Sequence, residues 1–264
     1  MKITTRRAIT RYDSAGMTSI EDTLVEEFPL TIYINDVEFA TLVCSPEYLE
    51  ELVVGFLASE GVIRHFNEIE SINLDDRGGF CHIHLFREVV TDHFTYSKRV
   101  LGSCCGKSRQ FYFQNDAETT KTSMSRTTLT PSACISLMQE MQSSSMVFKK
   151  TGGIHNASLG TKDGAFLHRG DIGRHNALDK LYGHCLRNRI SVKDKVLIFS
   201  GRISSEVLTK AAKIGVGIVL SKSAPTNLAI KMAEDLNITA VGFIRGDSFN
   251  IYSHPWRIEK EFSY

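Results

Sequence analysis

The fold of this chain is decided by one stretch, Val196-Leu-Ile-Phe-Ser-Gly-Arg-Ile-Ser-Ser-Glu206, in which a short apolar run ends abruptly in Ser-Gly. Four consecutive apolar residues bounded by a turn are typical of a strand that is buried on both faces. A serine at 204 or 205 can then cap a following helix. The stretch therefore predicts a strand over 196–200 and a helix over 204–214, which together form one unit of an α/β sheet.

The same alternation continues on both sides of this unit. Further strands are predicted over 217–220, 238–244 and 250–252, with a helix over 226–236 between the first two. Upstream, Thr130-Pro131 is a helix start, because threonine caps well and proline fits the first turn. Helices that alternate with strands in this way cover both faces of one sheet. The second half is therefore expected to be an α/β sandwich.

The first half shows a different pattern, with more strands and a single helix. Alternating apolar and polar residues over 28–43 predict a hairpin that turns at Asn35-Asp36. Ser45-Pro46 offers a cap for a helix that ends near Glu60-Gly61, where glycine can take a left-handed conformation. Two more alternating runs lie around Arg77-Gly78-Gly79, over 69–74 and 80–86. This pattern predicts a smaller α+β unit.

These patterns divide the chain into two units. We expect an N-terminal α+β unit over 1–113, whose first 24 residues are polar and peripheral. A polar run over 114–130 is expected to be a flexible linker, because it has little apolar periodicity. The α/β unit, expected to bind a cofactor, then covers 131–264.

Composition excludes several classes of protein. The chain has 264 residues and a formal net charge of +1, so no strong attraction to nucleic acid or membranes is expected. The start, Met1-Lys-Ile-Thr-Thr-Arg-Arg-Ala8, lacks the apolar region of a signal peptide, and no apolar run has membrane-spanning length. Six cysteines without regular spacing do not resemble a secreted disulfide framework or a metal site. A cytoplasmic, reduced protein without a metal is expected.

Two adjacent cysteines, Cys104 and Cys105, are the candidates for chemistry. They lie among small residues in Arg99-Val-Leu-Gly-Ser-Cys-Cys-Gly-Lys-Ser-Arg109, with several cations nearby. Cations stabilise a thiolate, which is the nucleophilic form of cysteine. The stretch predicts a reactive thiol on a flexible loop. The other cysteines lie in apolar segments and are interpreted as packing residues, namely Cys44, Cys81, Cys134 and Cys185.

Polar residues gather where the second half passes from one element to the next. The first such place combines Thr151-Gly-Gly-Ile-His-Asn-Ala157 with the helix start after Gly170. In that helix, Arg174 and His175 would face an anion, and His175 could pair with Asp179 four residues later. The alternative is a capped surface helix with an ordinary His–Asp pair.

Two further junctions follow neighbouring predicted strands. The first carries Arg202 and Ser204, and the second carries Lys222, Ser223 and Thr226. Each alone is an ordinary helix start. Since α/β sheets bind ligands outside the carboxyl ends of their strands, two such junctions together predict a pocket for a phosphorylated ligand that carries a nucleotide.

The chain resembles the FdhD family in a series of ordered motifs from Glu27 to Pro255. The motifs that carry the resemblance are Ser45-Pro46, Gly55-Phe-Leu-Ala-Ser-Glu-Gly61, Thr151-Gly-Gly-Ile-His-Asn-Ala157, Asp171-Ile-Gly-Arg-His-Asn-Ala-Leu-Asp-Lys180, Ser200-Gly-Arg-Ile-Ser-Ser-Glu206, Lys222-Ser-Ala-Pro-Thr226 and Val241-Gly-Phe-Ile-Arg245.

The resemblance implies a sulfur carrier that formate dehydrogenase needs for activity. Such a carrier accepts a persulfide sulfur from a cysteine desulfurase on a loop cysteine. It passes the sulfur to the molybdenum (or tungsten) bis-molybdopterin guanine dinucleotide cofactor, held by its GDP-like guanine nucleotide ends. The resemblance also implies a homodimer and a cytidine-deaminase-like C-terminal αβα sandwich without zinc. The segment that matches the family's cofactor-binding stretch is Phe243, Ile244, Arg245, Gly246, Asp247 and Ser248.

The cysteine motif departs from the family pattern. Many members separate the two loop cysteines by two residues, whereas Cys104 and Cys105 are adjacent. Alignment on Cys-Gly-Lys places Cys105 at the second family cysteine and Gly102 at the first; a gap instead places Cys104 at the first. Either thiol could therefore carry the persulfide.

Three other functions are alternatives to the sulfur carrier. A chaperone that binds the cofactor without transferring sulfur is the main alternative. A zinc nucleoside deaminase would need H-x-E and P-C-x-x-C, and a thiol redox protein would need C-x-x-C, and the chain has neither signature.

Overall fold

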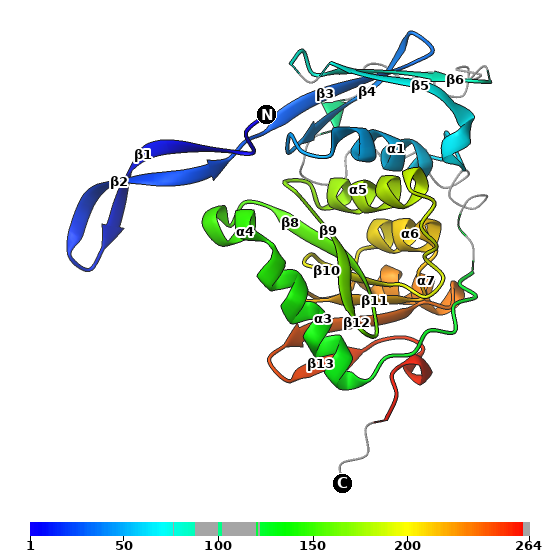
Figure 1. Cartoon of the computed structure of the whole chain (residues 1–264). Helices are drawn as coiled ribbons and strands as arrows, with labels where there is room; N and C mark the ends of the chain where they lie inside the picture. The colour runs from blue at the N-terminus through cyan, green and yellow to red at the C-terminus, as the bar shows by residue number, and fades with distance from the viewer. Residues whose placement is uncertain (76, 88–99, 102–119, 121, 261–264) are drawn as a thin grey trace.

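A computed structural model describes residues 1–75, 77–87, 100–101, 120 and 122–260 of the chain. Its strands and helices stack in layers: helices lie between two sheets, and the helix over 131–144 covers the far face of the larger sheet (Figure 1). The strands are β1 Thr4–Asp13, β2 Gly16–Val25, β3 Phe28–Ile34, β4 Val37–Cys44, β5 Ile69–Asp75, β6 Phe80–Leu85, β7 Val100–Leu101, β8 His155–Thr161, β9 Gly164–Asp171, β10 Val196–Phe199, β11 Ile218–Ser221, β12 Thr239–Arg245 and β13 Ser248–Ile251. The helices are α1 Leu49–Ser59, α3 Pro131–Ser144, α4 Met146–Thr151, α5 Arg174–Arg187, α6 Ser205–Ile214 and α7 Asn227–Asp235.

The C-terminal unit is the predicted αβα sandwich. Its six-stranded sheet has the order β13-β12-β11-β10-β8-β9, and β10, β11 and β12 run parallel. Alternate residues of β10 point to opposite faces, because Leu197 packs with α5, α6 and α7 while Ile198 packs with α3. A strand covered by helices on both sides must be apolar throughout, which is why this run decides the fold.

The N-terminal unit contains a second sheet, with the order β5-β6-β3-β4-β7, covered on one face by α1. The predicted hairpin is confirmed as β3 and β4, and both turn residues, Asn35 and Asp36, have positive φ. Aspartate and asparagine tolerate that conformation well. Helix α1 ends at Ser59 with Glu60 as its C-cap, and Gly61 has φ 75°, so the predicted end of the helix is confirmed.

The first 25 residues form a two-stranded ribbon that the sequence did not reveal. Among the described strands, β1 and β2 pair only with each other, and they project away from the layers (Figure 1). Their segments are rich in threonine and charge, so the apolar alternation that marks a half-buried strand is absent. The prediction that this segment is peripheral is confirmed.

The cap predicted at Ser45 is wrong. Helix α1 begins at Leu49 after Tyr48, which has φ 54° and makes no side-chain cap. Ser45 is fully buried, and its hydroxyl binds Asp171 from the other unit. By contrast, the caps predicted at Thr130, Ser204 and Thr226 are confirmed.

The two units meet through α1 and α5, which lie side by side between the sheets (Figure 1). Their backbones approach so closely that an added Cβ at Gly55 would lie 1.8 Å from the Asp179 carbonyl oxygen. An added Cβ at Gly183 would lie 1.8 Å from the Glu51 carbonyl oxygen. Only glycine fits this helix crossing. The proposed boundaries of the two units stay predictions, although 122–130 hydrogen-bonds to the C-terminal unit at several points.

Candidate functional site

The two predicted junctions that follow β10 and β11, together with the segment that follows β12, lie along one edge of the large sheet. Because β10, β11 and β12 are parallel, the residues that follow them emerge at the same edge. The Ser223 hydroxyl donates to the Ser200 carbonyl at 3.5 Å, and the Phe243 amide donates to the Ser223 carbonyl at 3.2 Å. We call residues 172–175, 200–202, 222–223 and 243–247 the carboxyl edge.

The start of α5 and the start of β8 reach the same edge. Strand β9 runs in the direction of β10, because each is antiparallel to β8 between them. The backbone amide of Asn156 donates to the Ser200 hydroxyl at 2.9 Å, which places His155 beside the loop that follows β10. His155 lies in the motif Thr151 to Ala157, but it is not among the site residues that the sequence predicts. Burial, followed by the nearby Arg174 and His175, lowers the pKa of His155, so its imidazole is neutral at neutral pH.

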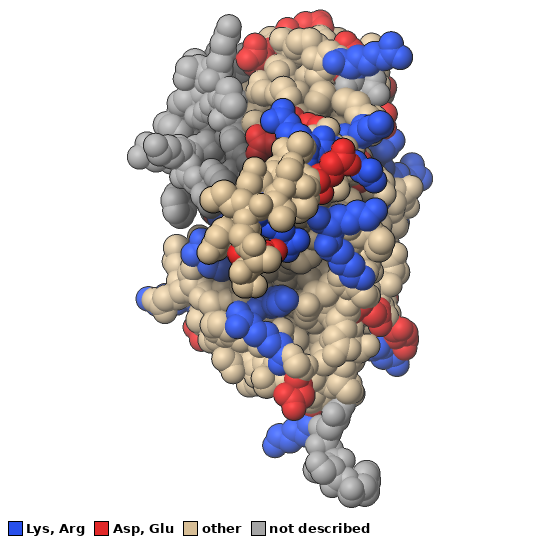
Figure 2. All heavy atoms as spheres, turned by 90° about the vertical axis from the view of Figure 1, so that its left-hand side faces the viewer, with Lys and Arg blue, Asp and Glu red and all other residues tan. Residues whose placement is uncertain are grey.

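Cations dominate the exposed side chains of the carboxyl edge. Arg202, Lys222 and Arg245 are exposed, and Arg174 is half-buried. The Lys222 ammonium reaches across to α3 and donates to Gln142 at 3.1 Å. Figure 2 shows the side of the molecule that holds the ribbon, with Lys and Arg side chains spread over its middle. An anionic ligand with more than one phosphate fits this charge distribution.

Several residues that the sequence predicts to contact a ligand have side chains that cap helices or pack in the core. The hydroxyls of Ser204 and Thr226 accept hydrogen bonds from the amides of Val207 and Ala229, so they begin α6 and α7. Ile244 is buried against α3 in the core. A ligand could meet these residues only through their backbones.

Phe243 is held in an unusual backbone conformation at the end of β12. Its φ is 56°, a region that bulky residues rarely occupy. The register of β12 against β13 shifts between Gly242 and Arg245, and an added Cβ at Gly242 would lie 2.9 Å from the Ser223 carbonyl oxygen. The loop after β11 therefore packs closely against the strand where the bulge begins. The Arg245 guanidinium lies 5.6 Å from the exposed Phe243 ring. Such strain is most often found at functional sites.

The expected pair of His175 with Asp179 is wrong. His175 instead lies 2.9 Å from Glu206 of α6, and burial lowers its pKa although Glu206 acts in the opposite direction. Asp179 accepts from the Ser59 hydroxyl at 2.6 Å and forms an ion pair with Lys210. The spacing of four residues permits a pair between His175 and Asp179, but side chains from other helices lie closer to both residues.

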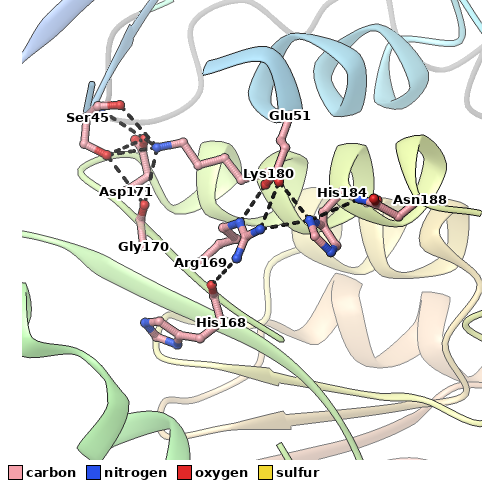
Figure 3. A network of polar contacts seen from close by, with 9 residues as sticks. All are labelled: Ser45, Glu51, His168, Arg169, Gly170, Asp171, Lys180, His184 and Asn188. Carbon is pink, nitrogen blue, oxygen red and sulfur yellow. Dashed lines mark hydrogen bonds and ion pairs between the residues drawn. The ribbon is translucent and has the colours of Figure 1, made fainter. Parts of the chain in front are cut away.

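The motif Asp171 to Lys180 builds a buried polar joint between the two units (Figure 3). Asp171 and Lys180 are both fully buried and lie 2.7 Å apart. The Ser45 amide and hydroxyl both donate to the same Asp171 oxygen, at 3.0 and 2.9 Å. The second Asp171 oxygen accepts from the Gly173 amide and the Asn176 side chain. Ser45, Asp171 and Lys180, which are fully buried, therefore hold the two units together.

A second group in the same joint surrounds Arg169 (Figure 3). Arg169 forms a bidentate pair with Glu51 of α1, at 2.6 and 2.9 Å, and also contacts His184. Its guanidinium stacks over the ring of Tyr48, which has a left-handed backbone, at 3.9 Å from the ring centre. Burial would raise the pKa of Glu51, but the bonds from Arg169 and His184 outweigh it and lower that pKa.

The cysteines divide as predicted where the structure describes them. Cys44, Cys81, Cys134 and Cys185 are buried, so their interpretation as packing residues is confirmed. Burial raises the pKa of Cys44 and Cys81 to about 12 and that of Cys185 to about 11. These three thiols stay protonated and are poor nucleophiles at neutral pH. Cys104 and Cys105 lie outside the described residues.

The described residues contain neither a metal-ligand cluster nor a helix of membrane-spanning character. No group of three or more histidine, cysteine, aspartate or glutamate side chains in this part of the chain could hold a metal ion. No helix within the described ranges is long and apolar enough to cross a membrane.

Fold and site define an α/β protein with a cationic edge at the carboxyl ends of its parallel strands. A model of the FdhD/NarQ family matches residues 25–259, so the chain belongs to that family. Sulfur carrier protein FdhD from Bacillus subtilis (strain 168) is 58% identical over 259 residues, which is 98% of this chain and 99% of that protein. Sulfur carrier protein FdhD from Staphylococcus haemolyticus (strain JCSC1435) is 61% identical over 254 residues, or 96% of each chain.

A solved structure supports the fold. The crystal structure of a candidate formate dehydrogenase accessory protein from Desulfotalea psychrophila matches with a TM-score of 0.80. The match covers 98% of this chain and 100% of that one, at 23% identity. The ribbon lies largely before the residues that the family model matches, yet nearly the whole chain aligns with this structure.

Proposed function

We propose that the chain is a sulfur carrier in formate dehydrogenase maturation. In this proposal Cys104 or Cys105 accepts a persulfide sulfur from a cysteine desulfurase and delivers it to a bound molybdenum (or tungsten) bis-molybdopterin guanine dinucleotide. The observation that carries the proposal is the burial of the other four cysteines, since it leaves only the adjacent pair for chemistry. The names of the relatives support the same role.

The sulfur transfer can be written so that atoms and electrons balance. The thiolate of Cys104 or Cys105 attacks the outer sulfur of the donor's persulfide, so a new sulfur–sulfur bond forms and the donor departs as a thiolate. A second thiolate then attacks the inner sulfur of the carrier's persulfide and releases hydrosulfide toward the metal. The disulfide that results is reduced by an external thiol. The cations that flank the pair in the sequence favour the thiolate needed for the first step.

The carboxyl edge is the proposed site for the guanine nucleotide ends of the cofactor. Arg174, Arg202, Lys222 and Arg245 would meet the pyrophosphates, and Phe243 offers an exposed ring for a base. The same geometry would serve a chaperone that binds the cofactor without transferring sulfur, because none of these residues is a thiol. That chaperone is the second candidate function.

Intact-protein mass spectrometry after incubation with a cysteine desulfurase and cysteine tests the carrier. We expect the protein to gain one sulfur atom, and either Cys104→Ala or Cys105→Ala to abolish the gain. Cys185→Ala is the matched control and should keep it, because this thiol is buried. An unmodified wild-type protein beside an active desulfurase would favour the chaperone, as would a double variant without both thiols that still activates formate dehydrogenase.

The edge is tested by binding of guanosine diphosphate. The triple variant Arg202→Gln, Lys222→Gln and Arg245→Gln should bind it about 100-fold more weakly, because charge-assisted bonds to phosphate are lost. The matched control Lys162→Gln, Arg189→Gln and Lys231→Gln removes the same charge from exposed positions elsewhere and should bind normally. Equal affinity of the two triple variants, measured by calorimetry, would place the nucleotide somewhere else.

A second copy of the chain is also a proposed partner, besides the desulfurase and formate dehydrogenase. The ribbon of β1 and β2 supports this, because an isolated two-stranded sheet is marginally stable in water. Tyr12 and Met17, at its tip, are 77% and 78% exposed and would be covered by a partner.

A further inference from the structure

A separate pocket of about 640 Å³ lies at the opposite end of the parallel strands from the carboxyl edge. It opens between the C-terminal ends of α1 and α6 and the segment 122–126, close to the amino end of β11. Apolar atoms of Ala58, Tyr182 and Ala212 line part of it. A volume of this size is within the range of small-molecule sites.

The charges around this pocket all have one sign. Arg64, Arg126, Lys193 and Lys213 line it, and no aspartate or glutamate is among its described lining residues. The whole chain is nearly balanced, with 31 basic and 30 acidic residues, so four cations among the described lining residues of one pocket are a local concentration of positive charge. Like charges around a hollow repel one another unless an anion lies between them.

The walls of the pocket are held in place by hydrogen bonds from the surrounding chain. The Asn237 side chain donates to the Ser123 carbonyl at 2.8 Å, and the buried Arg257 donates to the Ser125 carbonyl at 3.1 Å. On the other side, the Lys213 ammonium donates to the Ser59 carbonyl at 2.6 Å, which fixes one cation at the end of α1. The pocket is therefore formed before any ligand arrives.

Glu68 holds the loop that carries Arg64. Glu68 accepts from the backbone amides of Arg64 and His65, at 2.6 and 2.7 Å, and lies 3.7 Å from Arg87. Glu68 thus shapes the loop that presents the Arg64 side chain.

We infer that this pocket binds a small organic phosphate, with the phosphate between the rim cations and an apolar or aromatic ring against Tyr182. A phosphate dianion carries more negative charge and more acceptor oxygens than a carboxylate, so it can bind several cations at once. A ring on the ligand would cover the apolar wall of the pocket, whereas inorganic phosphate alone would leave that wall exposed to water. The site lies at the opposite end of the parallel strands from the carboxyl edge, and its test below does not depend on the proposed function.

The test uses pyridoxal 5′-phosphate as the probe, because its aldehyde forms an imine with a lysine amine and releases water. Borohydride reduces the imine to a stable amine, and peptide mapping then locates it. We expect Lys193 or Lys213 to be labelled at least about tenfold more than Lys162, an exposed lysine outside the pocket, since a bound phosphate raises the local probe concentration. Pyridoxal without the phosphate should show no such preference.

Two variants separate the pocket from general surface charge. Arg64→Gln with Arg126→Gln keeps both pocket lysines and should lower their labelling about tenfold. Arg202→Gln with Arg245→Gln removes the same charge from the carboxyl edge and should leave it unchanged. Thermal melting of each variant confirms that it is folded. Three results would each overturn the inference: equal labelling of all lysines, labelling confined to Lys222, or undiminished labelling of the pocket lysines in the variant that lacks Arg64 and Arg126. None of them depends on the outcome of the sulfur-transfer experiment.

Discussion

Replacement of Lys180 by methionine is expected to lower the free energy of unfolding by about 3–5 kcal/mol, because it leaves a buried carboxylate without its counter-ion. Lys180 and Asp171 are both fully buried. Asp171 would keep hydrogen bonds from Ser45, Gly173 and Asn176, but hydrogen bonds alone do not replace the lost positive charge. Since Ser45 belongs to the other unit, the loss should weaken the contact between the units.

Urea unfolding of the purified variant measures this loss. Lys195→Met is the matched control, because Lys195 also pairs with an aspartate, but Asp194 is 66% exposed. Removal of that pair should cost less than about 1 kcal/mol. If Lys180→Met were as stable as this control but bound guanosine diphosphate poorly, the motif from Asp171 to Lys180 would be a ligand site and not a structural joint.

Replacement of Gly183 by alanine should also destabilise the protein, by about 3 kcal/mol, because overpacking forces a backbone shift. In a free helix the same change stabilises by up to about 1 kcal/mol. Here the new Cβ would lie 1.8 Å from the Glu51 carbonyl oxygen, and no flexible side chain can move aside. The structure therefore reverses the sign expected from helix propensity.

Thermal and urea unfolding of Gly183→Ala should show a lower midpoint. Gln139→Ala, on the exposed side of α3, introduces alanine into a helix without any such contact and should be neutral or slightly stabilising. A Gly183→Ala protein that melts at or above the wild-type temperature would contradict the close helix crossing.

The α/β fold could be predicted from the sequence because its signals are local. The run 196–199 is apolar throughout since both faces of its strand are covered, and Ser204 and Thr226 follow the ordinary rules for helix starts. Parallel strands then bring the following loops to one edge without further information. The carboxyl edge was predicted for this reason.

The joint could not be predicted, because its partners are far apart in the chain. Ser45 satisfies the local rule for a helix cap, but Asp171, 126 residues later, takes its hydroxyl. His175 and Asp179 satisfy the spacing rule for a helical pair, but Glu206 and Lys210 of α6 are their partners. Local rules say which contacts are possible, and only the packed structure decides between them.

The strained Phe243 was also hidden from local reasoning. Glycine or asparagine would signal a positive φ, whereas phenylalanine in an apolar run indicates an ordinary strand. The bulge lies where Gly242 packs closely against Ser223, a contact between residues far apart in the chain.

The contact between α1 and α5 has a consequence for synthesis of the protein in the cell. The outer surface of α1 is completed by a helix that ends at Arg187, 128 residues after α1 ends at Ser59. A ribosome needs on the order of ten seconds to add that much chain. During this interval the first unit has emerged with an uncovered helix, so early translation is the period in which a nascent chain of this protein depends most on protection from aggregation.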